Sequence, residues 1–336
     1  MTLSIEDTRN NVSEDKDSTT SEEASDDESS SENDAPYDPD YTIVLEMPDS
    51  IIERIDLEPL KNLTEQDYKD GHAPRFGKSN PEIIEVPFWS AMIAAQENPF
   101  GAYSILQESD RFPNYNGIDD FWAPETENST GEEGGEDKEQ VARTCSRRLP
   151  TWTFASRFGQ TMTRLPDGRL VFIGGEYDDS YDPDFHVYND VCVYDESSTE
   201  ASGDGGGFTV YCYPRDVFPP TDFHTATLVP DTSDIYVIGC MGYPDQRRPG
   251  ETPVYRLDTR GFSMHPVETS GEKPGWISQH CACIVEDGTA IRVWGKKRRS
   301  FGSQIYVEDD EKRGDIVDFE GEYLLHLETG RWSRQA

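Results

Sequence analysis

The stretch DGRLVFIGGEYDD, residues 167–179, combines a turn, a short apolar run, two adjacent glycines and then acidic residues. The Asp-Gly pair that opens it is typical of a turn between strands, and the apolar residues 170–173 favour a buried strand. A strand that runs directly into Gly174 and Gly175 indicates a backbone that turns with positive φ or passes close to a neighbouring segment. The stretch therefore predicts a hairpin whose second strand is buried and ends at Gly174.

The same pattern occurs three times in the chain. The copies read RFGQTMTRLPDGRLVFIGG, TDFHTATLVPDTSDIYVIGC and ISQHCACIVEDGTAIRVWGK, at 157–175, 221–240 and 277–296. Each begins its first strand after a Gln or a His, and these residues are Gln160, His224 and His280. Each ends its second strand at a glycine, and these glycines are Gly174, Gly239 and Gly295. Three copies in register predict a repeat architecture.

Each copy is followed by two more expected strands. The third strand carries a tyrosine, which is Tyr194, Tyr255 or Tyr323. The fourth strand carries an aromatic residue in the last two copies, Phe262 and Trp332. Each unit therefore predicts a four-stranded antiparallel sheet. One such sheet cannot bury both of its faces alone, so neighbouring sheets must stack.

These features resemble the kelch repeat, the blade of a β-propeller. That family has a histidine at its first strand, a Gly-Gly pair after its second, a tyrosine in its third and a tryptophan in its fourth. The first copy keeps both Gly174 and Gly175, whereas Cys240 and Lys296 replace the second glycine in the other copies, and Gln160 replaces the first histidine. The resemblance spans about 150–334 and implies an all-β fold of about three kelch-type blades in an incomplete or open ring.

The small number of repeats leaves three arrangements open. Closed propellers use about four to eight blades. The chain is then truncated, or it self-associates to complete a ring, or it forms an open stack. The aromatic residues of 81–125 are expected to cap the exposed face of the first blade, and the candidates are Trp89, Phe100, Phe121 and Trp122.

Three parts of different composition follow one another along the chain. Residues 1–40 are acidic and Ser-rich and are expected to be a disordered tail, with serines that suit an acid-directed kinase. Residues 41–147 are expected to be irregular, with one short helix over 88–97 and a flexible acidic insert at 126–140. Residues 148–334 hold the kelch-like blades.

The chain is strongly acidic, with 67 Asp and Glu against 30 Lys and Arg and a formal net charge of −37. A nucleic-acid interface needs a basic face, so we expect no nucleic-acid binding, and a basic protein partner is favoured. No apolar run predicts a membrane span or a secretory signal, so we expect a cytoplasmic or nuclear protein without a membrane partner. The six cysteines fit free thiols in a reducing compartment, with Cys281 and Cys283 buried on one strand face.

Two loops that follow the glycines carry the candidate binding residues. The first loop, 176–190, holds Tyr177, Asp178, Asp179, Asp182, Asp184 and His186. Its carboxylates suit Ca²⁺, but the spacing is not that of an EF-hand, so we expect a solvated acidic loop and no metal. The second loop, 241–253, holds Arg247 and Arg248, which either bind a carboxylate or phosphate or pair with the first loop.

Two functions from different classes fit this organisation. The first is a non-catalytic interaction module whose loops bind a protein partner. The second is a small-ligand or glycan-binding and processing propeller, which would use Tyr177, Asp182, His186 and Arg247. The chain has no catalytic motif such as Gly-x-Ser-x-Gly and no recognisable copper-radical set, so we expect neither enzyme activity nor a cofactor. His224 and His280 are expected to be structural, because they occupy equivalent repeat positions.

Overall fold

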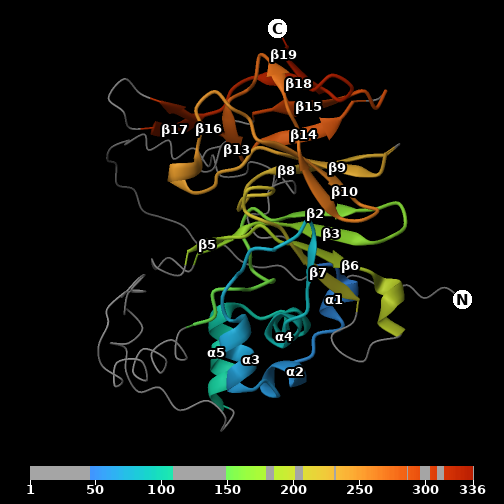
Figure 1. Ribbon diagram of the computed structural model, residues 1–336, viewed down its shortest axis with the longest axis vertical. Helices are drawn as coiled ribbons and strands as arrows, with labels where there is room; N and C mark the ends of the chain where they lie inside the picture. The colour runs from blue at the N-terminus through green and yellow to red at the C-terminus, as the bar shows by residue number, and fades with distance from the viewer. Residues whose placement is uncertain are drawn as a thin grey trace, which may run out of the picture. The chain divides into compact units, whose positions relative to one another are not determined.

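A computed structural model describes residues 46–108, 149–178, 185–200, 207–230, 232–285, 287–295, 303–308 and 314–335 of the chain (Figure 1). These residues all belong to one compact unit, Thr42–Ala336. Several sequence expectations lie outside the described residues: those for 1–40, 126–140, Phe121, Trp122, Asp179, Asp182, Asp184 and Lys296.

Most of the regular secondary structure in the described residues is β-sheet, and the three main sheets are antiparallel meanders. The first contains β2 (Thr161–Arg164), β3 (Leu170–Ile173), β6 (Val191–Tyr194) and β7 (Phe208–Cys212). The second contains β8 (Thr225–Val229), β9 (Asp234–Ile238), β10 (Val254–Asp258) and β11 (Ser263–Pro266). The third contains β14 (Cys281–Ile284), β15 (Ala290–Trp294), β18 (Glu322–His326) and β19 (Arg331–Arg334). None of the described sheets closes into a barrel.

Short strands extend these sheets. β1 (Glu82–Ile84) pairs with β7, and β12 (Ser270–Gly271) pairs with β19 in parallel. β13 (Trp276–Ser278), β16 (Gln304–Glu308) and β17 (Gly314–Asp318) form a smaller sheet, and β4 (Glu176–Tyr177) pairs with β5 (His186–Val187). The all-β prediction is confirmed at the level of antiparallel sheets. Gly174, Gly239 and Gly295 lie directly after the second strands, and Tyr255 and Tyr323 occupy equivalent positions on β10 and β18. Tyr194 lies on β6, but the register places Cys192 at the equivalent position. Trp332 lies on β19, whereas Phe262 precedes β11, so the prediction that Phe262 lies on the fourth strand was wrong.

The described residues before β2 form five short helices, where the sequence predicted one. They are α1 (Asp49–Ile52), α2 (Glu58–Lys61), α3 (Glu65–Gly71), α4 (Pro87–Ala95) and α5 (Pro99–Glu108). α4 is the helix expected over 88–97; it begins at Pro87 and ends at Ala95, and the next residue, Gln96, caps it with a φ of 52°. α3 begins at a capping box formed by Thr64 and Asp67. This region is therefore more regular than the sequence predicted.

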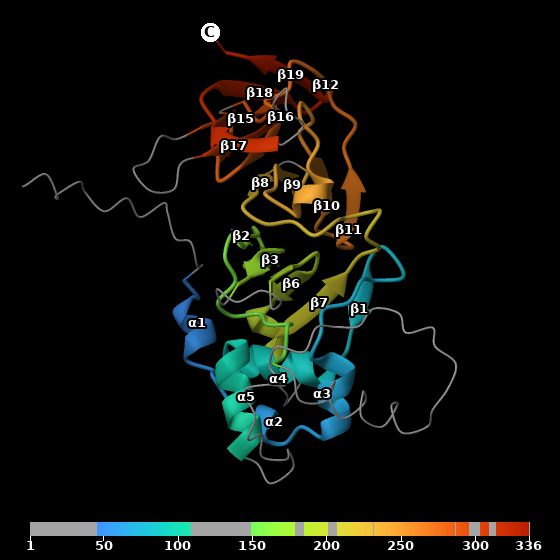
Figure 2. The same cartoon turned by 90° about the vertical axis from the view of Figure 1, so that its left-hand side faces the viewer.

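The helices cover the outer face of the first sheet (Figures 1 and 2). Phe172 of β3 belongs to the same apolar cluster as Trp89 of α4. Trp89 stacks on Trp152, with ring centroids 4.4 Å apart. Phe100, in contrast, is 66% exposed and takes no part in that cluster. One of the two described candidates for a cap, Trp89, thus covers the sheet.

Strand β3 is buried on both faces because its alternate residues enter two different apolar clusters. Phe172 faces the helices, whereas Val171 and Ile173 pack with Ile235 and Val237 of the second sheet. Burying each such side chain stabilises the fold by roughly 1.5–3 kcal/mol. The continuous apolar run of the opening stretch, without polar alternation, follows from this double burial.

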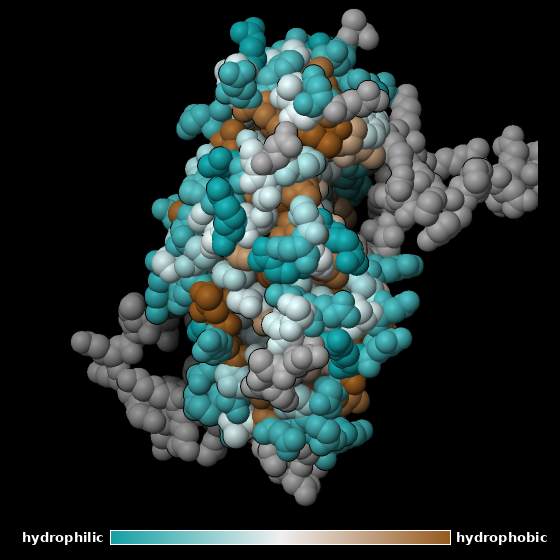
Figure 3. All heavy atoms as spheres, turned by 90° about the vertical axis from the view of Figure 1, so that its right-hand side faces the viewer, coloured by the Kyte–Doolittle hydropathy of each residue, from teal (hydrophilic) through white to brown (hydrophobic). Residues whose placement is uncertain are grey.

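The third sheet is apolar on its inner face and carries charged side chains on its outer face. Ile291 packs with Ile238 of the second sheet, whereas Arg292 and Glu322 form an exposed ion pair at 2.6 Å. Figure 3 shows one face of the molecule, on which most side chains are hydrophilic and the apolar areas are small. On the edge strand β14, Cys283 is exposed and Cys281 is half-buried, so the prediction that both thiols are buried was wrong.

A repeated set of backbone hydrogen bonds joins the sheets just before their first strands. Phe223 N donates to Gly159 O at 3.0 Å, and Gln279 N donates to Phe223 O at 2.8 Å. All three residues have positive φ, between 46° and 61°. Each is followed directly by a first-element residue of the repeat: Gln160, His224 or His280. The start of each repeat is therefore also a point of close contact between sheets.

His224 and His280 bind the preceding sheet. His224 Nε2 lies 2.8 Å from Thr161 Oγ1, and His280 Nε2 lies 3.1 Å from Thr225 Oγ1. Burial lowers the pKa of both imidazoles to about 3, so both rings are neutral near pH 7. Each buried histidine therefore ties one sheet to the next.

We predict that Gly174 tolerates substitution less well than Gly175. Both have positive φ, 53° and 91°. A Cβ at Gly174 would run into the backbone carbonyl of Thr221, which cannot rotate away, whereas a Cβ at Gly175 would lie 2.9 Å from the Cβ of Gln160. Gly174→Ala should lower the free energy of unfolding by about 1–3 kcal/mol more than Gly175→Ala does. Urea unfolding followed by circular dichroism measures both.

Gly168→Ala and Gly261→Ala are matched controls, because no atom lies within 4 Å of a Cβ built at either position. Gly168 has a φ of 94°, so Gly168→Ala measures the cost of the positive φ without a steric clash. Gly261→Ala should leave the free energy of unfolding nearly unchanged. A larger loss in Gly175→Ala than in Gly174→Ala would contradict the repeat register.

Candidate functional site

Loops from the first and second sheets meet at one end of these sheets, which we call the loop end. Its described residues are 174–178, 185–190, 213–224 and 239–253. Tyr243 joins two of the loops: Val187 N donates to its hydroxyl at 3.0 Å, and Phe185 meets its ring edge-on with centroids 5.6 Å apart. The opposite end, the tight-turn end, comprises 165–169 and 259–262.

A buried ion pair lies beneath the loop end. Arg157 Nη1 lies 2.5 Å from Asp190 Oδ1, and Arg157 Nη2 lies 3.0 Å from Asp190 Oδ2. Arg157 also donates to the carbonyl oxygens of Thr153 at 2.6 Å and Gly174 at 3.0 Å, and Trp152 Nε1 donates to Asp190 at 2.9 Å. Buried charges require such complete hydrogen bonding. The pair therefore fixes the incoming segment and the Gly174 carbonyl against the start of β6.

Aromatic rings enclose this ion pair. The Arg157 guanidinium lies 3.8 Å from the centroid of the Tyr188 ring and 5.5 Å from that of Trp152. Trp152 stacks on Trp89 of α4. Contacts between a desolvated guanidinium and aromatic faces contribute about 2 kcal/mol. The helices, the first sheet and the loop end thus meet at one buried charge.

Glu176 and Asp222 form a pair of carboxyl groups under the loops. Asp222 is fully buried, and its Oδ1 accepts a hydrogen bond from Gly242 N at 2.7 Å and lies 3.4 Å from Cys240 Sγ. Burial and the charge of Asp222, to which Glu176 is hydrogen-bonded, raise the pKa of Glu176 to about 9. Glu176 is therefore protonated near pH 7 and donates to Asp222. This shared proton links the segment after β3 to the segment that leads into β8, and the hydrogen bond from Gly242 N joins the loop after β9 to the same carboxylate.

The large pocket of the loop end has a volume of about 490 Å³. Its walls combine aromatic, cationic and acidic side chains, which include Arg75, Phe76, His186, Arg215, Tyr243 and Asp245. Phe76 is 43% exposed, and the Arg215 guanidinium lies 5.6 Å from its ring centroid. Exposed aromatic rings beside arginines are typical of protein interfaces.

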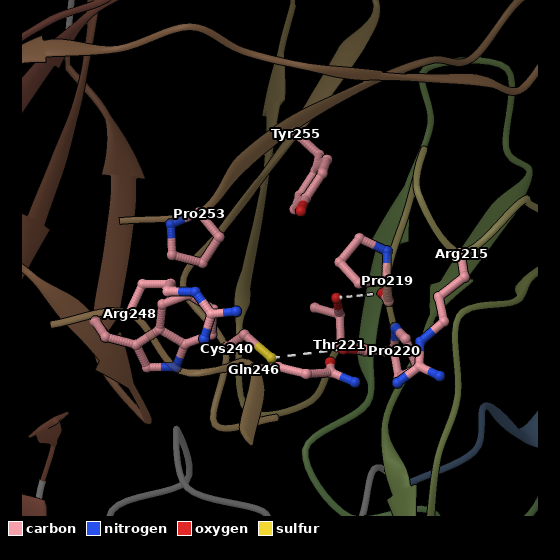
Figure 4. A pocket seen from close by; sticks show the side chains of 10 residues that line it. Arg215, Pro219, Pro220, Thr221, Cys240, Gln246, Arg248, Pro253 and Tyr255 are labelled. Atoms are coloured by element: carbon pink, nitrogen blue, oxygen red, sulfur yellow. Dashed lines mark hydrogen bonds between the residues drawn. The ribbon is translucent and has the colours of Figure 1, made fainter. Parts of the chain in front are cut away.

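A small pocket of about 290 Å³ shares Arg215 with the large one. Figure 4 shows the guanidinium groups of Arg215 and Arg248 entering it from opposite sides, with the Tyr255 hydroxyl and the Gln246 amide between them. Apolar side chains complete its walls: Pro219, Pro220, Pro253 and Trp276. None of its lining residues is acidic.

The candidate residues of the first loop lie in different surroundings. Tyr177 is buried in the apolar cluster under the helices, so its side chain does not face the loop surface. His186 lines the large pocket. The charge of Asp178 adds to the effects that raise the pKa of Glu176.

The two candidate arginines of the second loop also differ in their contacts. Arg247 donates to the carbonyl oxygens of Met241 at 2.9 Å and Gly242 at 3.0 Å, which holds its own loop in place. Arg248 donates to the Asp245 carbonyl at 3.0 Å and lines the small pocket. Only Arg248 of the two presents its guanidinium to a pocket that the structure describes.

Sequence reasoning missed several residues of the loop end: Arg157, Asp190, Asp222, Arg215 and Gln246. The sequence carries a signal for Arg157 and Asp190, because each is a charged residue next to apolar residues that are expected to be buried. A buried charge requires a partner of opposite charge. Arg215 and Gln246 carried no such signal, since each is a polar residue in a loop, where polar residues are ordinary.

No protein-family model matches the chain, and no curated protein matches it. Among solved structures, the chain is similar to the Hadza microbial sialidase Hz136, with 12% identity over 56% of this chain and 40% of that chain and a TM-score of 0.31. It is also similar to MPT-4, a mannose phosphorylase from Leishmania mexicana, with 9% identity over 55% of this chain and 53% of that chain and a TM-score of 0.27. The matches span about half or less of those two chains, and at these TM-scores they assign no activity to this one.

Within the residues that the structure describes, no group of His, Cys, Asp and Glu side chains is arranged to hold a metal ion. The helices of the same residues lack the length and apolar character needed to cross a bilayer.

The Glu176–Asp222 pair predicts a defined dependence of stability on pH. The folded chain keeps a proton on Glu176 that the unfolded chain releases above its ordinary pKa of 4.5, so the contribution of this group falls as pH rises from about 4.5 to about 9. Glu176→Gln keeps a donor for Asp222 but removes this titration. Its free energy of unfolding should therefore rise relative to the unmodified chain between about pH 5 and about pH 8.5.

Urea unfolding at the two pH values measures this difference. Glu53→Gln is the matched control, because Glu53 is exposed and forms no ion pair among the described residues. A gap between Glu176→Gln and the unmodified chain that stays constant with pH would contradict the shared proton.

Proposed function

We propose that the chain is a non-catalytic interaction module of the kelch type, which binds a protein partner through the large pocket of its loop end. The observation that carries this proposal is the exposed Phe76 ring beside Arg75, Arg215 and Tyr243 in that pocket. Aromatic residues and arginines are the side chains that contribute most to binding at protein interfaces. The net charge of −37 favours a basic partner at long range.

The proposed architecture is an open stack of three propeller blades. Each main sheet has four strands in chain order, and adjacent sheets pack face to face through apolar clusters. His224 and His280 tie successive sheets by the same contact. Sheets that stack through repeated contacts are the construction principle of β-propellers. Completion of the ring by a second copy stays a proposal, which the mass of the chain in solution decides.

Binding rather than catalysis fits the chemistry of the two pockets. The Glu176–Asp222 pair has the raised pKa that acid–base catalysis uses, but it lines neither pocket. The alternative, a small-ligand or glycan-processing site, requires Tyr177 and Arg247 to converge on a substrate. Tyr177 is a core residue, and Arg247 is bound to backbone carbonyls. The interaction module is therefore the better supported of the two.

Affinity capture from a cell extract with quantitative mass spectrometry tests this proposal. Phe76→Ala and Asp245→Lys change the rim of the large pocket, and both should remove a stoichiometric partner that the unmodified chain retains. Phe100→Ala removes a more exposed aromatic ring on α5, and Arg260→Glu reverses a charge at the tight-turn end. Both controls should keep the partner. A partner that all four variants retain equally would contradict binding at the loop end.

A further inference from the structure

We propose that the small pocket binds a phosphomonoester group, held between Arg215 and Arg248, with an apolar body against its proline and tryptophan walls. This inference deepens the proposed function and rests on it for the source of the group, which is a phosphorylated side chain of the partner. The sequence predicted a phosphate or carboxylate ligand, as one alternative, only for the second loop, at Arg247 and Arg248. The structure adds Arg215, from a different loop, as the opposite wall.

The two arginines are the first part of the argument. Arg215 forms no hydrogen bond or ion pair with the residues described, and its guanidinium lies 5.6 Å from the centroid of the Phe76 ring. Arg248 uses Nη1 for two backbone carbonyls, of Asp245 and Arg247, and bonds to no described carboxylate. In a chain with 67 acidic residues, two cations without a carboxylate partner that face each other across one pocket form a local positive site. Guanidinium groups present the donors that a phosphate accepts.

The neutral donors are the second part. Gln246 Nε2 is buried and has no acceptor among the described residues, which is costly unless a ligand or water completes it. The Tyr255 hydroxyl also makes no hydrogen bond with described residues, and burial raises its pKa to about 12, so it stays a donor at neutral pH. Together with the arginines these groups reach the pocket from several directions (Figure 4). That arrangement suits a tetrahedral oxyanion better than a flat carboxylate.

The walls define the rest of the ligand. Three prolines and the Trp276 ring line the rest of the pocket, and these side chains are uncharged and largely apolar. Such walls accept an apolar body next to the anion and add affinity through buried apolar area. The acidic surface elsewhere on the chain repels free polyanions, so a phosphorylated residue within a basic segment fits the net charge and the pocket together.

Isothermal titration of the full chain with phenyl phosphate tests the site, with phenol as the neutral counterpart. We expect saturable one-to-one binding of phenyl phosphate and none of phenol. Arg215→Gln and Arg248→Gln should each weaken binding by about tenfold or more, because each removes a charged donor. Arg260→Gln, at the tight-turn end, should leave binding unchanged. All three positions are exposed or at a turn, and thermal unfolding verifies that each variant folds.

Phenyl phosphate that fails to saturate, or that binds Arg215→Gln and Arg248→Gln as tightly as the unmodified chain, overturns the inference. Saturable binding of phenol with equal affinity overturns it too, since the apolar walls alone would then explain the ligand. The capture experiment uses Phe76 and Asp245, which line only the large pocket of the two. If phenyl phosphate does not bind but the partner is captured at the large pocket, this inference alone is refuted. If phenyl phosphate binds as expected but no partner depends on the large pocket, the proposed function alone is refuted.

Discussion

The buried pair of Arg157 and Asp190 is the interaction on which the arrangement of this chain depends. A charge taken out of water is tolerated only when every donor and acceptor is matched. Arg157 reaches Asp190, the Gly174 carbonyl and the Thr153 carbonyl at once. Asp190 in turn accepts from Trp152, which stacks on a helix. Through these contacts one ion pair sets the position of the helices, of the first sheet and of the loop that follows Gly174.

The second constraint is the close approach of successive sheets at the loop end. Gly174 and Gly239 lie where a side chain would strike the backbone carbonyls of Thr221 and Ile277, in the segments that lead into the next sheet. Phe223 and Gln279 adopt positive φ at the equivalent joints. Because the sheets approach this closely, the small pocket forms between the segment that leads into β8 and the loop after β9. The large pocket adds residues of the loop after β3. The candidate site is thus a consequence of how the sheets stack.

Much of this architecture could be predicted from the sequence, because its signals are local and recur. An apolar run that ends at a glycine, three times in register, indicated the hairpins that β2–β3, β8–β9 and β14–β15 form. His224 and His280 lie directly before β8 and β14, where the same recurrence had placed them.

The site was harder to predict, because it is assembled from residues without a local signature. Arg215 and Arg248 lie in different loops, and only stacking of the first and second sheets brings them to one pocket. Glu176 and Asp222 likewise belong to different repeats and meet only in the folded chain. Tyr177 followed a glycine pair and was assigned to the loop, but β4 turns it into the core under the helices. Tertiary packing, which no local pattern records, decided each of these cases.

A double-mutant cycle at Arg157 and Asp190, measured by urea unfolding, tests the central claim most directly. Arg157→Met leaves a buried carboxylate without its partner and should lower the free energy of unfolding by about 3–5 kcal/mol. Arg157→Met combined with Asp190→Leu removes both charges and should lose much less than the sum of the two single changes. Single changes that each cost less than about 1 kcal/mol and add without coupling would contradict the role of this ion pair.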